Sequence, residues 1–179
     1  MSLIVDTLEG VRPVARRWSV PVSIATYIGS IVLANWLTAH FGLVPIGFGL
    51  LVTAGTFAAG VALVTRDWVQ VASGRRVVLA AILAGALISA FTSSRALAVA
   101  SGTAFLVSEL IDLGVFTPLR GRSLALAVLL SSVVSAPVDT VLFLWLAGFN
   151  LTWQAVVGQF IVKTVIALAV AFWIAWRRR

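Results

Sequence analysis

Hydrophobic positions form long, nearly continuous runs along this chain, and short polar stretches separate them. Between Arg17 and Arg66 there is no Asp, Glu, Lys or Arg. That stretch is too long for one membrane-spanning helix of about 20 residues, and it suits two. Because Gly and Pro interrupt helices, the segment His40-Phe41-Gly42-Leu43-Val44-Pro45 predicts a turn that divides the stretch. We therefore expect helices over residues 19–40 and 46–65.

The remaining apolar runs predict four more helices. Residues 66–76 are polar at both ends and are expected to form a loop. Further interruptions come at Ser93-Ser94-Arg95, around Pro118, and at Gly148-Phe149-Asn150. The four helices are expected over residues 77–92, 96–117, 123–147 and 151–176. The pattern thus predicts an all-α integral membrane protein, a bundle of six transmembrane helices.

Composition supports a membrane protein and excludes several other classes. Apolar side chains make up 61% of the 179 residues and charged ones 11%, against about 45–50% and 25% in soluble domains. There is no cysteine, and His40 is the only histidine, which leaves too few ligands for zinc. The sequence has no GxxxxGK[ST], GxSxG or HExxH motif. We expect no cofactor, no metal and no enzymatic activity.

Basic residues cluster at alternate ends of the predicted helices. With the N-terminus in the cytoplasm, eleven of the thirteen lie on the cytoplasmic side and only Arg95 on the other. The eleven are Arg12, Arg16, Arg17, Arg66, Arg75, Arg76, Arg120, Arg122, Arg177, Arg178 and Arg179. This asymmetry predicts an N-in/C-in, multi-pass protein of the cell inner (cytoplasmic) membrane. It also explains the net charge of +7 without a nucleic-acid partner; the expected partner is the lipid bilayer.

The same pattern divides the chain into three parts. Residues 1–18 are expected to form a cytoplasmic or interfacial N-terminal segment. Residues 19–176 form the six-helix membrane domain, and residues 177–179 are a cytoplasmic basic tail. A homodimer is compatible with this organisation.

Four ionisable residues fall inside predicted helices, namely Glu109, Asp112, Asp139 and Lys163. Each costs roughly 2.5–3.5 kcal/mol or more at the centre of a membrane helix, so each must face a partner or a water-lined cavity. At 1.5 Å per residue, Glu109 and Lys163 come to similar depth, and we expect an ion pair between them. Asp139 comes level with Asn35.

Three carboxylates against one lysine leave acids without a partner, even if Arg95 reaches inward. Such acids must bind something, take up a proton or contact water. Pro137, two residues before Asp139, interrupts its helix as is typical of cavity-lining segments. The alternative is that these charges only hold helices together.

Three segments of the fourth predicted helix carry a resemblance to a known family. They are Ser94–Ser101 (SRALAVAS), Ala104–Asp112 (AFLVSELID) and Phe116–Arg120 (FTPLR). With Val138-Asp139-Thr140 and Lys163 on the next two helices, the chain resembles the VUT family of queuosine-precursor transporters. The resemblance implies import of a deazapurine, 7-cyano-7-deazaguanine or its aminomethyl form.

The residues are compatible with such a purine-like substrate. A guanine-like base offers a ring N–H and an exocyclic amine side by side, and the carboxylate of Glu109 or Asp112 can accept both. Aromatic rings stack on bases for about 1–3 kcal/mol each; the candidates are Trp36, Phe91, Phe105 and Trp145. The predicted substrate-binding residues are Asn35, Arg95, Ser101, Phe105, Glu109, Asp112, Asp139 and Lys163.

Two other functions stay open from the sequence. One is a substrate-binding membrane subunit of an energy-coupled vitamin or nucleobase importer. The other is a structural membrane protein that transports nothing. For a transporter, coupling to protons through Asp112 or Asp139 and facilitated diffusion are both compatible with the residues.

Overall fold

Six helices and one β-hairpin make up residues 13–177, the part of the chain that the computed structural model describes. The helices are α2 (Pro13–Phe41), α3 (Thr56–Ser73), α4 (Arg75–Thr92), α5 (Arg95–Leu119), α6 (Leu124–Leu146) and α7 (Trp153–Arg177). The hairpin strands are β1 (Leu43–Gly47) and β2 (Leu50–Thr53). Most of the predicted N-terminal segment, residues 1–12, and residues 178–179 of the basic tail lie outside the described residues.

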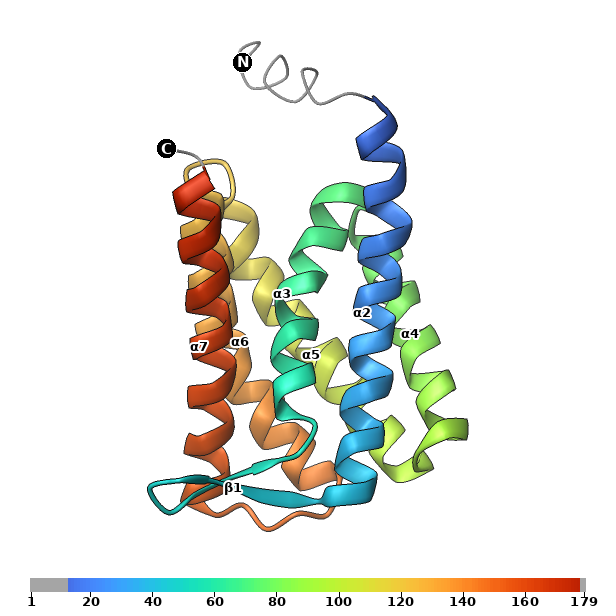
Figure 1. Cartoon of the computed structure of the whole chain (residues 1–179), viewed down its shortest axis with the longest axis vertical. Helices are drawn as coiled ribbons and strands as arrows, with labels where there is room; N and C mark the ends of the chain where they lie inside the picture. Colours follow the sequence, from blue (N-terminus) through green and yellow to red (C-terminus); the bar gives the residue numbers. More distant parts are fainter. Residues whose placement is uncertain (1–12, 178–179) are drawn as a thin grey trace.

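The helices run up and down along one long axis (Figure 1). The first residues of α2 and the last residues of α7 lie at one end of the bundle, and the hairpin lies at the other end (Figure 1). Short connections between successive helices allow this up-and-down arrangement. Gly74 joins α3 to α4 with a φ of 83°, a conformation that glycine adopts without strain.

Five of the described helices are long and apolar enough to cross a membrane: Val20–Phe41 within α2, α4, α5, α6, and Trp153–Trp173 within α7. Helix α3 is not among them, because Arg66 and Asp67 lie near its middle. Large apolar side chains such as Leu87, Phe91 and Val99 are exposed on the outside. Such a surface suits lipid as solvent.

The hairpin overturns part of the predicted fold. We expected only helices, with one beginning at residue 46, but α3 begins at Thr56. Pro45 instead lies in β1, opposite Leu51 of β2. The tip of the hairpin, Gly47-Phe48-Gly49, has positive φ at all three residues. Two glycines and a proline within five residues disfavour a helix and allow the chain to reverse.

The predicted polar loop at residues 66–76 is also wrong. Helix α3 continues through Arg66 and Asp67 to Ser73, and both charged side chains are buried. The sequence argument assumed that these charges needed water, whereas partners on α5 surround Arg66 (see below). By contrast, the bounds of α4 to α7 agree with the predicted helices to within two residues.

Candidate functional site

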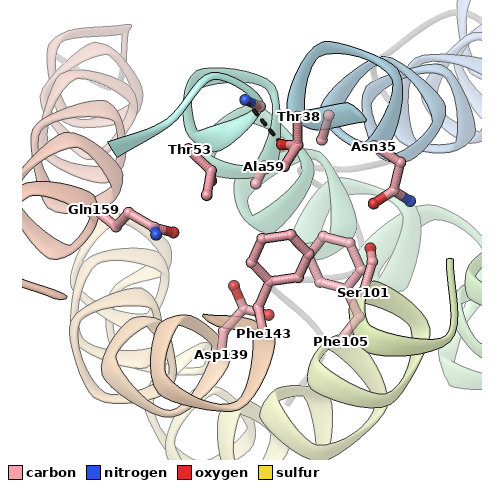
Figure 2. Close-up of a pocket in the computed structure, with 11 residues that line it drawn as sticks. Asn35, Thr38, Thr53, Ala59, Ser101, Phe105, Asp139, Phe143 and Gln159 are labelled. Carbon is pink, nitrogen blue, oxygen red and sulfur yellow. Dashed lines mark hydrogen bonds between the residues drawn. The ribbon is translucent and has the colours of Figure 1, made fainter. Parts of the chain in front are cut away.

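A polar cavity lies beneath the hairpin, where five helices meet β2 (Figure 2). Its volume is about 20 Å³, roughly enough for one water molecule. Its walls come from every described helix except α4. The lining residues are Ala34, Asn35, Thr38, Thr53, Gly55, Ala59, Ser101, Phe105, Asp139, Phe143 and Gln159.

Two side-chain amides face this cavity from opposite walls, Asn35 on α2 and Gln159 on α7 (Figure 2). Each is 1% exposed, and neither amide nitrogen has a hydrogen-bond partner among the described residues. A buried polar group without a partner costs about 1–3 kcal/mol. An amide can donate and accept, and its oxygen and nitrogen can exchange places by a flip. The two amides are therefore free to bind a polar guest.

Asp139 provides the carboxylate of the cavity, and Lys163 is its partner. The Lys163 Nζ donates to Asp139 Oδ2 at 2.7 Å and to Thr140 Oγ1 at 2.8 Å. The predicted Glu109–Lys163 ion pair is thus wrong. Residue counting placed the two at similar depth, but α7 packs against α6, α3 and β2 rather than α5. Lys163 thus balances the negative charge of Asp139, and it is not itself among the residues that line the cavity.

Two aromatic rings line the cavity, Phe105 of α5 and Phe143 of α6 (Figure 2). The other stacking candidates lie elsewhere. Trp36, Phe91 and Trp145 are 39%, 88% and 65% exposed on the outside of the bundle. None of these three side chains lines the cavity.

A second buried cluster surrounds Arg66 on α3. Its Nε lies 3.0 Å from Glu109 Oε2, and its Nη2 lies 2.5 Å from Asp112 Oδ1 and 3.3 Å from Asp67 Oδ1. The first two contacts are ion pairs by distance without hydrogen-bond alignment, whereas the contact with Asp67 is aligned. All four residues are at most 2% exposed. The Arg66 cluster therefore joins α3 to α5.

Helix α5 carries one face that runs from the cavity to the Arg66 cluster. Ser101 and Phe105 line the cavity, and Glu109 and Asp112 follow on the same face. Spacings of four, four and three residues keep the side chains aligned along one side of a helix. The two buried sites are therefore neighbours along α5.

The structure separates the eight predicted site residues into four groups. Asn35, Ser101, Phe105 and Asp139 line the cavity. Lys163 supports Asp139, whereas Glu109 and Asp112 belong to the Arg66 cluster. Arg95 is exposed in the first turn of α5 and does not line the cavity.

Sequence reasoning missed Gln159, Thr53 and the inward position of Arg66. An uncharged glutamine gives little signal in an apolar helix. However, Gln159 lies four residues before Lys163 and thus on the same helical face, and this spacing could have identified it. No comparable sequence signal separates Arg66 from the loop arginines.

Taken together, apolar helices of membrane-spanning length around a small buried cavity with polar walls define a multi-pass membrane protein. The sequence profile of the family described as "putative vitamin uptake transporter" matches residues 21–176. The chain belongs to that family and is a membrane transporter. No curated protein and no solved structure matches it. The predicted family is confirmed at this level, and membership points to transport rather than catalysis.

Proposed function

We propose that the protein imports a queuosine precursor, 7-cyano-7-deazaguanine or its aminomethyl form, across the cytoplasmic membrane. The observation that carries this proposal is the composition of the cavity wall. One carboxylate, two buried amides and two phenyl rings face the same small space. A flat, polar, guanine-like base needs these groups.

Asp139 takes the role that the sequence gave to Glu109 or Asp112. Its carboxylate accepts the ring N–H and the exocyclic amine of the base. Asn35 and Gln159 pair with the remaining donors and acceptors around the ring. Phe105 and Phe143 stack on its faces.

The hairpin is the part of the protein that must move to admit the base. Thr53 of β2 lines the cavity, and a Cβ added at Gly158 of α7 would overlap the Leu51 carbonyl oxygen of β2. β2 and α7 are thus in close contact, and the cavity beneath them has room for about one water molecule. A base needs more room, so the described conformation is a closed one, and the hairpin separates from α7 when substrate enters.

We further propose that all six helices cross the inner membrane with the hairpin outside. The connections between α3 and α4 and between α5 and α6 lie at the bundle end opposite the hairpin, and the connection between α4 and α5 lies at the hairpin end (Figure 1). The first two connections carry or adjoin Arg75, Arg76, Arg120 and Arg122, and the third adjoins Arg95. Cytoplasmic loops carry the excess of basic residues. Neutralisation of Arg66 by α5 supports α3 as the sixth crossing, although its composition is less apolar.

Uptake of radiolabelled 7-cyano-7-deazaguanine tests this function in cells unable to make the compound. We expect accumulation only when the gene is present. No uptake by cells whose membranes contain the protein would overturn the substrate assignment. Uptake by proteoliposomes of the purified protein alone separates a complete transporter from a subunit that needs a partner complex.

A further inference from the structure

The Arg66 cluster holds more negative than positive charge in the buried interior of the bundle. Three carboxylates surround one guanidinium, and all four residues are at most 2% exposed. Uncompensated charge inside a membrane protein is expensive and marks functional positions, among them proton relays. At least one of the three acids therefore needs a further cation or a proton.

Asp67 is the carboxylate farthest from the guanidinium nitrogens, although its contact with Arg66 is the aligned hydrogen bond of the three. It shares the Arg66 Nη2 with Asp112, at 3.3 Å against 2.5 Å. Its second oxygen has no hydrogen-bond partner among the described residues. Glu109 and Asp112 also have oxygens without a hydrogen-bond partner, but of the three acids Asp67 is the one that lines the second cavity, described next.

A second cavity reaches Asp67 from the end of the bundle opposite the hairpin. Its volume is about 360 Å³, and its lining includes Asp67, Trp68, Leu124, Val128 and Val170. These residues belong to the second half of α3, the start of α6 and the end of α7. This cavity therefore lies between Asp67 and the end of the bundle that carries the basic loops.

A further buried polar group without a partner lies in the core beside α3. Tyr27 of α2 is 1% exposed, and its hydroxyl has no hydrogen-bond partner among the described residues. Tyr27 belongs to the same core cluster as Leu63 and Val69, which lie one turn before and after Arg66 on α3. A buried hydroxyl without a partner suits a site that holds an exchangeable proton or its water.

Other charged groups lie on neighbouring helices. Arg75 begins α4, and Asp139 of α6 is paired with Lys163 of α7. Neither Arg75 nor Lys163 forms an ion pair with the Arg66 cluster in the part of the chain that the structure describes.

We propose that Asp67 is the proton-binding residue of the Arg66 cluster and that its protonation is coupled to transport. A hydronium ion in the second cavity transfers its proton to the free Asp67 oxygen and leaves as water. This proposal rests on the chain being a transporter and not on which base it carries.

Helix α3 links the proton site to the substrate cavity directly. Ala59 of α3 lines the substrate cavity and Arg66 lies two turns further along the same helix, about 10 Å away at 1.5 Å per residue. Charged Asp67 competes with Asp112 for the Arg66 Nη2. Protonated Asp67 leaves that atom to Asp112 alone and tightens α3 against α5, which bears Ser101 and Phe105.

Infrared pH-difference spectra of the purified protein without substrate test the proton site. We expect a carboxylic-acid C=O band that appears as the pH falls, is lost in Asp67→Asn and is shifted in Asp67→Glu. Asp139→Asn is the matched control, since it removes a buried acid outside the cluster, and it should keep the Asp67 band. An identical band in wild type and Asp67→Asn would overturn the proposal. If Asp67→Asn does not fold, an unshifted band in Asp67→Glu overturns it equally.

Proteoliposome transport then tests the coupling. With 7-cyano-7-deazaguanine as probe, Asp67→Asn should lose uptake driven by a pH gradient but keep exchange of labelled for unlabelled compound. Equal loss of both activities in a folded variant would assign Asp67 to structure instead. Wild-type protein with the Asp67 band but no transport of the probe would refute the proposed substrate and leave the proton site in place.

Discussion

Lys163 of α7 and Asp139 of α6 form a buried ion pair with a 2.7 Å hydrogen bond, and each residue is 3% exposed. The pair connects neighbouring helices and also holds the one carboxylate that lines the cavity beneath the hairpin. Under the proposed function we expect it to serve both stability and substrate binding, and we expect these two roles to be separable by mutation.

Asp139→Asn should abolish deazaguanine uptake and also lower stability, because Lys163 is left charged and buried without its partner. Removing one member of a buried pair costs about 3–5 kcal/mol. The matched variant combines Asp139→Asn with Lys163→Met. Since no charge is then left unpaired, stability should largely return while uptake stays absent. Thermal unfolding in detergent and whole-cell uptake measure the two effects; full uptake by the double variant would remove Asp139 from the site.

Arg66→Gln should destabilise the protein more than any substitution at a loop arginine, because it leaves three carboxylates in the interior. The expected loss is about 3–5 kcal/mol. Arg66→Lys should recover only part of it, since an ammonium is a point charge and cannot contact Glu109 and Asp112 through separate nitrogens. The control is Arg120→Gln, in the loop between α5 and α6. A melting temperature of Arg66→Gln equal to that of the control would contradict the buried cluster.

Phe105→Ala and Phe143→Ala should each weaken binding of 7-cyano-7-deazaguanine by about 1–3 kcal/mol, the value of one base stacked on an aromatic ring. Trp145→Ala is the control, because that larger side chain does not line the cavity and is 65% exposed. Equilibrium binding to the purified variants measures the difference. A larger loss in Trp145→Ala than in the two Phe variants would speak against stacking in this cavity.

Gly158→Ala should lower both stability and uptake, since the added methyl group would overlap the Leu51 carbonyl of the hairpin. Gly114→Ala is a matched control within a helix, because nothing lies within 4 Å of the added Cβ. Replacing a helical glycine with alanine at such an open site should stabilise by about 0.5–1 kcal/mol. Thermal unfolding of the two variants checks the sign of each effect, and a stabilised Gly158→Ala protein would contradict the close contact between β2 and α7.

Hydrophobic periodicity and loop signals were sufficient for α4 to α7, where each apolar run ends at a Gly, Pro, Ser or Arg cluster. They failed between residues 43 and 55. A short apolar run with glycines is compatible with a helix or a strand, and only the pairing of Leu43 with Thr53 distinguishes them. The buried acids of α5 and α6 and Lys163 were also evident, since charge inside an apolar helix is rare.

The partners of those charges could not be predicted. Depth along the helix axes gave Glu109 and Lys163 similar positions, but partner choice depends on which helices are neighbours. Arg66 was placed in a loop for a related reason. The sequence shows its charge but not the two acids of α5 that neutralise it.

Equilibrium binding of labelled 7-cyano-7-deazaguanine to the purified wild-type protein is the most direct test of the central claim that the cavity beneath the hairpin is the substrate site. We predict saturable binding that is lost in Gln159→Leu and in Asn35→Leu, two variants that leave both buried ion clusters intact. Folded wild-type protein that binds none of the compound would contradict the proposed substrate, and binding unchanged in both variants would contradict the site.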